Sequence, residues 1–337
     1  MTATRTGGDR RLFRDGREFV GFGSARVAPP RRASLDGFLT VGGLRFVHDD
    51  ARARTRVLHR SLSGDMPLTN PAGVLHRAGA PMRLTVDELR ALNARFETQT
   101  PEQILRFVKS TFGPRAALLS SMQRAGSVLA HMADAMDYAL DVLFVDTGVL
   151  HDETLRTRDR LVASTRNLRV ITLAPAHSFA EQTRADGVLY LTREGQERCC
   201  DLRKSAPLHT VRGRYDALIS GLRRDEGGAR AKVAIFALDA EMNALRVHPL
   251  ANFTSAAIDR YVAKHDGVVL NPLHAMGFPT IGCHPCTTPV RADEPERAGR
   301  WRHLAGVEYC GINPTDRAGG AQDIDLDDRY AAALRTT

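Results

Sequence analysis

At 337 residues the chain is long enough for one large domain with an appendage, and its composition excludes a fibrous or wholly disordered protein. It has no run of about 18 apolar residues, and its start, MTATRTGGDRRLF, lacks the apolar stretch of a secretory signal, so we expect a soluble, cytoplasmic protein with no membrane partner. The net charge of +8 is concentrated in residues 1–80, which hold 14 arginines, no lysine and seven acidic residues.

We interpret residues 1–85 as an Arg-rich N-terminal extension of unknown role. Short apolar runs within it, such as GFLTVGGLRFV, predict a small hairpin or subdomain. An arm that contacts nucleic acid or a partner is the alternative, because arginine clusters favour such contacts. Residues 81–337 are almost neutral, with 33 basic and 32 acidic side chains. We therefore expect no nucleic-acid partner.

Two helices follow the extension. They are predicted over LTVDELRALNARFE and TPEQILRFVKSTFG. In the second, Thr100 is expected to cap the amino end, Pro101 to take the first helical position, and Gly113 to end the helix.

From Ala116 onward, short apolar runs alternate with amphipathic stretches. AALLSS, DVLFVDTG and LRVITLAP are predicted strands, and SVLAHMADAM and DETLRTRDRLVAST are the helices between them. Such βαβ units predict an α/β fold with a mostly parallel, twisted sheet and helices on both faces. Ligands bind such sheets at the carboxyl ends of the strands, so a nucleotide is expected at the turns SSMQRAGS and DTG.

The pattern of predicted elements changes in the last third of the chain. YDALISGLRR, KVAIFALD and LRVHPL are predicted strands, and TSAAIDRYVAKH is a predicted helix capped by Thr254. From Asn271 onward Gly, Pro and charged residues dominate, which indicates a loop region that bears a site. We place the boundary of the main domain at residues 86–313 and expect residues 314–337 to be a mobile C-terminal tail.

The five cysteines favour metal binding or catalysis over a disulfide framework, because their number is odd and no secretion signal precedes them. A redox dithiol at Cys283 and Cys286 would open a helix, but the surrounding Gly and Pro indicate a loop. Structural zinc prefers two C-x-x-C pairs, and the adjacent Cys199 and Cys200 do not supply one. A four-iron four-sulfur cluster suits all four thiolates. Cys310 alone is either a surface thiol or a nucleophile.

Several blocks of the sequence resemble one known family. CCDLRKSAPL, GLRRDEGGAR, HPL, NPLHAMGFPTIGCHPCT, DEPERAGRW and YCGIN occur in the order found in the assimilatory adenylyl-sulfate reductases, in the iron-sulfur group of the PAPS/APS reductase family. The resemblance covers residues 100–313 approximately. It implies an adenine nucleotide alpha hydrolase-like fold and the conversion of adenosine 5'-phosphosulfate and two thiol electrons into sulfite and AMP.

The resemblance also implies roles for the cysteines. Cys310 would attack the sulfur of the bound sulfate, and thioredoxin or a similar dithiol would release the resulting S-sulfocysteine as sulfite. A cationic neighbourhood would help by lowering the thiol pKa. The four-iron four-sulfur cluster would be held by the remaining cysteines: Cys199, Cys200, Cys283 and Cys286.

The implied substrate ligands fall into two groups. Backbone and side-chain groups after the first two strands would bind the nucleotide: Ser121, Asp146, Thr147 and Gly148. Cationic side chains would bind the phosphosulfate: Lys204, Arg223, Arg224, Arg230, Arg297 and Arg300.

The chain departs from the family pattern in two places. Met122, Ala125 and Gly126 replace an aromatic residue and two acids in the first nucleotide turn. Near Cys310, Asn313 stands where a histidine is common, and the Lys-Glu pair before the cysteine is replaced by Glu-Tyr, which removes positive charge from its surroundings. The rate, the nucleotide or the acceptor can therefore differ from that of relatives.

Three alternatives are weighed against this interpretation. An ATP-using adenylating enzyme of the same fold would need an S-G-G-x-D-S type turn, which SMQRAGS does not supply. A non-enzymatic iron-sulfur or nucleic-acid-binding regulator would not explain the presence of Cys310 and Lys204. A reductase that serves a specialised sulfur pathway shares the same chemistry and stays open, as does a homo-oligomeric state.

Overall fold

The computed structural model describes residues 81–304, 306–307, 312 and 324–335, together with five short strands before them. These strands are β1 (Leu12–Arg14), β2 (Arg17–Phe19), β3 (Thr40–Val41), β4 (Leu44–Arg45) and β5 (Arg56–Val57). The chain divides into two units, Met1–Arg52 and Ala53–Thr337. In the first unit β1 pairs with β2, and β3 pairs with β4 in the hairpin predicted for GFLTVGGLRFV.

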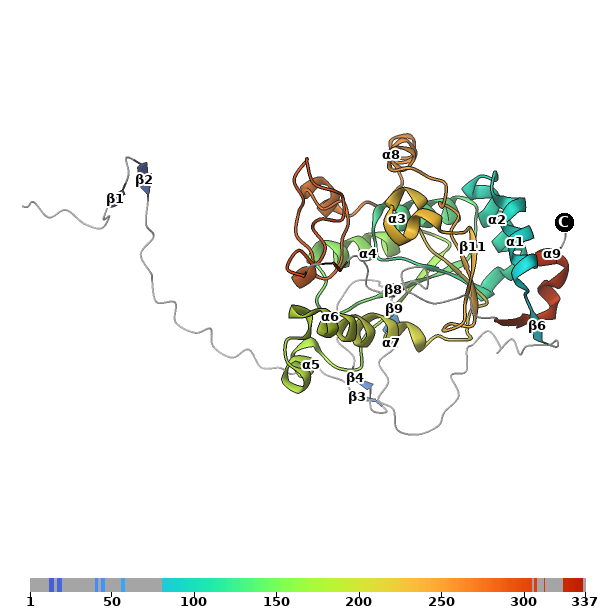
Figure 1. The fold of residues 1–337 in the computed structure, drawn as a ribbon, viewed down its shortest axis with the longest axis horizontal. Coiled ribbons are helices and arrows are strands. Elements are labelled where there is room, and N and C mark those ends of the chain that lie inside the picture. The colour runs from blue at the N-terminus through green and yellow to red at the C-terminus, as the bar shows by residue number, and fades with distance from the viewer. Residues whose placement is uncertain are drawn as a thin grey trace, which may run out of the picture. The chain divides into compact units, whose positions relative to one another are not determined.

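Within the described residues, the second unit is built on a seven-stranded sheet (Figure 1) with the order β11-β12-β10-β7-β8-β9-β5. All neighbouring strands are parallel except β11, which runs antiparallel to β12 at one edge. The strands not yet given are β7 (Ala116–Leu119), β8 (Leu140–Val145), β9 (Leu168–Leu173), β10 (Ala217–Ile219), β11 (Phe236–Asp239) and β12 (Ala244–Val247). The predicted mostly parallel α/β fold is confirmed. The edge strand β5 comes from residues that we had assigned to the N-terminal extension.

The predicted helices are present with the expected caps. Thr100 accepts a hydrogen bond from the backbone of Gln103, Pro101 begins the helix, and Gly113 ends it at a φ of 50°. Thr254 caps its helix in the same way. None of the helices in the described residues is long and apolar enough to span a membrane. The helices are α1 (Val86–Phe96), α2 (Pro101–Phe112), α3 (Arg124–Ala135), α4 (Asp152–Ser164), α5 (Phe179–Asp186), α6 (Arg193–Cys200), α7 (Ala206–His209), α8 (Ser255–Lys264) and α9 (Ala331–Arg335).

Apolar side chains pack on both faces of the sheet, because successive strand residues point to opposite sides. On one face Leu118 joins a large core with residues of α1, α2, α3, α4 and α8. On the other face Ala117 and Leu143 pack with Leu208 of α7 and with Tyr215. This two-sided burial holds the carboxyl ends of β7, β8 and β10 along one edge, where polar turns follow them.

The predicted mobile tail is wrong for residues 324–335. Strand β13 (Asp325–Asp327) pairs antiparallel with β6 (Pro81–Arg83), and α9 packs against α1. Ile324, Leu326 and Leu334 are buried in the main core. We predicted a mobile tail because the segment is mostly polar. It nevertheless has an apolar residue every two to four positions, and these residues anchor it in the core.

A buried acid fixes this C-terminal segment to the sheet. Asp216 accepts two hydrogen bonds from Arg115, at 2.5 and 2.7 Å, and one from the Tyr330 hydroxyl at 2.6 Å. Asp216 is fully buried, so each of these donors compensates for the loss of water around its carboxylate. Burial raises the pKa of Tyr330, so its hydroxyl stays protonated and donates.

We expect Tyr330→Phe to lower the free energy of unfolding by about 1–2 kcal/mol, because the ring packing is kept and one hydrogen bond to a buried charge is lost. Urea denaturation followed by circular dichroism measures the change. Arg90→Ala is the control: it removes an exposed ion pair with Asp87 and should change stability by less than about 0.5 kcal/mol. Equal stability of Tyr330→Phe and the wild type would contradict the assigned role of the hydroxyl.

Candidate active site

Two polar turns lie at the carboxyl ends of the parallel neighbours β7 and β8. Ser121 follows β7, and its exposed hydroxyl accepts a hydrogen bond from Gln123 Nε2 at 2.9 Å. Asp146 follows β8, and its Oδ1 accepts from the backbone N–H of Gly148 at 2.8 Å. Gly148 has a φ of 72°, which favours glycine. The fold therefore brings both predicted nucleotide turns to one edge of the sheet.

The departures from the family pattern in the first turn have local structural reasons. Met122 is buried in the main core, where it fills apolar space. Gly126 lies in the first turn of α3, and a Cβ there would be 2.6 Å from Ser120 Oγ. A larger side chain at Gly126 would therefore push α3 away from the end of β7.

All four cysteines predicted to hold a cluster line one pocket, together with Lys204. Cys199 and Cys200 end α6, which continues as a π-helical turn over Asp201–Ser205. Cys283 faces them from a loop that forms an isolated bridge with Leu150, and Cys286 closes a short 3₁₀ turn. The C-x-x-C segment therefore lies in a loop, as predicted.

The sulfurs of the two adjacent cysteines have polar groups beside them. Gln196 Nε2 donates to Cys200 Sγ at 3.1 Å, and Gln182 Nε2 donates to Cys199 Sγ at 3.6 Å. Lys204 Nζ lies 3.8 Å from Cys200 Sγ, as expected if its segment is helical. Donors of this kind stabilise thiolates and tune a metal group bound to them. The two glutamines were missed from the sequence, since a buried glutamine has no local signature.

Thr147 connects the nucleotide turn to the cysteine pocket. Its hydroxyl lies 3.3 Å from Cys283 Sγ, and its side chain is buried. The sequence assigned Thr147 to nucleotide binding alone, since Cys283 is 136 residues away in the chain.

The donor set fits a four-iron four-sulfur cluster. Burial, reinforced by the neighbouring Cys283, raises the pKa of Cys286 to about 12, and burial also raises the pKa of Cys199. Thiols packed together in this way become good ligands when metal replaces their protons. Among the described residues, no group of three or more His, Cys, Asp or Glu side chains converges tightly enough for a single metal ion. The predicted cubane cluster would take one thiolate at each of its four irons.

Arg203 connects the π-helical turn after α6 to the turn after β8, a role that was not predicted from the sequence. Its Nε donates to the Thr147 carbonyl at 2.5 Å, and its Nη1 donates to Gln182 Oε1 at 3.0 Å. A Cβ at Gly148 would lie 3.0 Å from Arg203 Nη2, so glycine there leaves room for the guanidinium. The available signal was its place one turn after Cys199, which puts both on one helix face.

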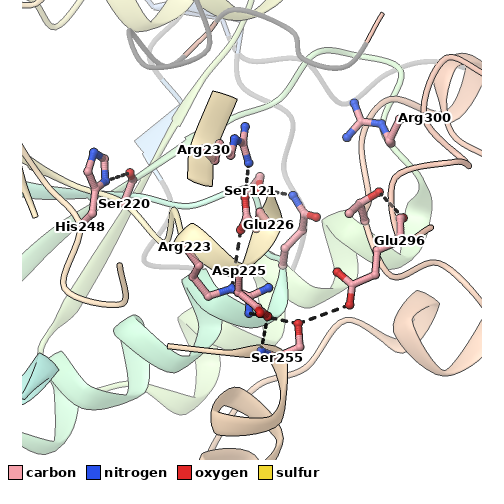
Figure 2. A network of polar contacts seen from close by, with 12 residues as sticks. Ser121, Ser220, Arg223, Asp225, Glu226, Arg230, His248, Ser255, Glu296 and Arg300 are labelled. Carbon is pink, nitrogen blue, oxygen red and sulfur yellow. Dashed lines mark hydrogen bonds and ion pairs between the residues drawn. The ribbon is translucent and has the colours of Figure 1, made fainter. Parts of the chain in front are cut away.

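Figure 2 shows a polar network after β10 that contains two of the predicted substrate-binding arginines. Arg223 Nη1 donates to Ser255 Oγ at 3.1 Å and lies 3.4 Å from Asp225 Oδ2. Arg230 Nη1 donates to Glu226 Oε2 at 2.5 Å. A Cβ at Gly221 would lie 2.7 Å from Ala125 Cβ, so the segment after β10 lies beside the first nucleotide turn.

Arg300 lies on the opposite side of this space in Figure 2, on the segment that pairs with the C-x-x-C loop. Its guanidinium stacks on Trp301 at 4.2 Å and donates to the Ile281 carbonyl at 3.4 Å. A Cβ at Gly282 would lie 2.4 Å from Arg300 Nη2, so a larger residue there would displace the guanidinium from this position. Arg297 is half-buried one turn earlier.

One predicted site residue among those that the structure describes is not brought into this arrangement. Arg224 forms an ion pair with Glu97 and donates to the Val233 carbonyl at 2.9 Å, so its guanidinium ties β10 to the end of α1. Cys310 lies outside the described residues, and its predicted role stays a prediction.

The fold and the site together define a class: α/β enzymes whose nucleotide site lies at the carboxyl edge of a parallel sheet. A family model, the phosphoadenosine phosphosulfate reductase domain, matches residues 115–289. The chain belongs to this family of PAPS/APS reductases, which confirms the resemblance found in the sequence.

Known proteins similar to this chain agree with the assignment. It is 38% identical to the adenosine 5'-phosphosulfate reductase of Streptomyces coelicolor over 68% of this chain and 96% of that protein. It is 34% identical to the enzyme of the same name from Mycobacterium tuberculosis, over 70% of this chain and 99% of that protein. The crystal structure of phosphoadenylyl-sulfate reductase from Candida auris matches with a TM-score of 0.53 and 19% identity, over 62% of this chain and all of that one. The last similarity supports the fold.

Proposed function

We propose that this chain catalyses the thiol-dependent reduction of adenosine 5'-phosphosulfate to sulfite and AMP. Relatives at 34 to 38% identity carry the name of this activity. The observation that carries the proposal is the contact of Thr147 with Cys283, because it joins the nucleotide turn to the cysteine pocket. A nucleotide bound at the turn would present its phosphosulfate close to this pocket.

The proposed nucleotide ligands are Ser121, Asp146, Thr147 and Gly148. The proposed phosphosulfate ligands are Lys204, Arg223, Arg230, Arg297 and Arg300. Guanidinium groups bind phosphate and sulfate oxygens through two parallel hydrogen bonds, which orients the anion as well as holding it. We leave Arg224 out of this set because its ion pair with Glu97 directs its donors elsewhere.

We propose that the four thiols in the pocket hold a four-iron four-sulfur cluster: Cys199, Cys200, Cys283 and Cys286. When bound, the cluster would fix the geometry of the site. Lys204, beside Cys200, would supply positive charge close to both the cluster and the substrate anion. Thr147 and Gln196 would hold the sulfurs in place through their hydrogen bonds.

Cys310 is the proposed nucleophile. Its thiolate attacks the sulfate sulfur, a sulfur–sulfur bond forms, the bond to the 5'-phosphate oxygen breaks, and AMP leaves. A dithiol such as thioredoxin then attacks the Cys310 sulfur and forms a mixed disulfide, and the electron pair of the broken bond leaves with sulfite. The second thiol of the dithiol releases Cys310 as a thiol. This reductant implies a reducing compartment, so we place the reaction in the cytoplasm.

One parallel assay tests this function. With thioredoxin as reductant, we expect sulfite from adenosine 5'-phosphosulfate with a kcat/KM at least about tenfold above that for the 3'-phosphorylated nucleotide. We expect no pyrophosphate from ATP. Pyrophosphate release would instead support an adenylating enzyme of the same fold. Equal sulfite formation from both sulfonucleotides would contradict the assigned substrate.

A further inference from the structure

Glu226 is an acid placed among the arginines that are proposed to bind the substrate anion. It ends the 3₁₀ turn Arg224–Glu226, which begins five residues after the end of β10. Its Oε2 accepts from Arg230 Nη1 at 2.5 Å, and its Oε1 lies 3.6 Å from Arg223 Nε. The side chain of Glu226 is 17% exposed, and those of Arg223 and Arg230 are 10% and 12% exposed. These charges therefore interact with little screening by water.

The neighbouring acids have other tasks. Asp225 Oδ2 also lies 3.4 Å from Arg223 Nη1, but the same oxygen accepts from the backbone N–H of Ser255 at 2.6 Å and so helps to begin α8. Glu296 accepts from the Ser255 hydroxyl at 3.3 Å (Figure 2). In the part of the chain that the structure describes, both side-chain contacts of Glu226 are with arginines. Glu226 is thus the acid in this network that contacts both Arg223 and Arg230.

A carboxylate and a sulfate or phosphate group compete for the same guanidinium donors, because each presents oxygens at hydrogen-bond distance with a negative charge. Cations are also crowded here: burial, together with the nearby Arg223, lowers the pKa of Arg124. The Glu226 carboxylate reduces the repulsion between these cations when no substrate is bound. It also reduces the positive charge that a ligand meets.

We propose that Glu226 is a specificity-determining residue that disfavours nucleotides with an additional phosphate. The proposal rests on the proposed function, in which Arg223 and Arg230 bind the phosphosulfate. Glu226 repels every negative charge of a bound nucleotide, and a 3'-phosphate adds close to two more charges. The penalty therefore grows with ligand charge, and the less charged nucleotide is favoured.

The experiment uses the full-length protein and two unreactive nucleotides, AMP and adenosine 3',5'-bisphosphate, with calorimetric titration at low salt. In Glu226→Gln, which keeps size and hydrogen bonding, we expect AMP to bind about threefold tighter and the bisphosphate about tenfold tighter. The preference for AMP should therefore narrow about threefold. Because salt screens such interactions, the change should shrink at high ionic strength.

Two further variants separate this role from a structural one. Glu226→Asp restores the charge and should restore most of the preference for AMP. Glu97→Gln breaks the ion pair with Arg224 outside the site and should leave both affinities unchanged. An unchanged preference in Glu226→Gln, or equal weakening of both nucleotides, overturns the proposal while leaving the reductase activity intact. A wild-type protein that binds neither nucleotide and forms no sulfite overturns the proposed function as well.

Discussion

Replacement of Cys310 by serine is expected to abolish sulfite formation, with a loss of at least about 1,000-fold in kcat. A thiol has a pKa of about 8.5, and a serine hydroxyl is far less acidic and a weaker nucleophile toward sulfur. Wild-type protein mixed with adenosine 5'-phosphosulfate without a reductant should carry one sulfonate group on Cys310, which thioredoxin removes. Peptide mass spectrometry detects the group, and a coupled sulfite assay measures the rate.

The control for this variant is nucleotide binding. AMP should bind Cys310→Ser within about twofold of the wild-type affinity, because the proposed nucleotide ligands lie on the sheet and its turns. Full sulfite formation by Cys310→Ser, or a sulfonate group on any other cysteine, would show that the mechanism assigns the wrong nucleophile.

The second large effect concerns the cysteine pocket. Protein purified without oxygen should be brown and contain about four irons and four sulfides per chain. Cys283→Ser should lose most of this iron and its visible absorption, because serine replaces one of the four proposed ligand thiolates. Iron analysis and absorption spectra give this result independently of activity.

Each of these two variants is the control for the other. Cys310→Ser should keep the iron content of the wild type while losing activity, whereas Cys283→Ser should lose iron. A colourless protein that contains zinc would contradict the cluster. A brown Cys283→Ser protein with four irons would contradict the assignment of Cys283 as a ligand.

Much of the fold could be predicted from local sequence, because helix caps and strand patterns depend on neighbouring residues. Thr100 and Thr254 cap the helices expected of them, and the alternation after Ala116 predicted the mostly parallel sheet. The packing of the C-terminal segment from Ile324 to Leu334 against the core was not predicted. Its stability comes from β6, α1 and the buried Asp216, which lie far away in the sequence.

The sequence by itself determined the family, since residue types and short spacings define its motifs. Only the tertiary structure decided which charged side chains lie in the candidate site and which form ion pairs elsewhere. Arg223 and Arg224 are adjacent in the chain, yet one lies beside Ser255 in the candidate site and the other pairs with Glu97. Glu97 is 127 residues from Arg224, and Thr147 is 136 residues from Cys283. The partner of a charge or a thiol is set by which strands and helices the fold brings together, and no local pattern contains that information.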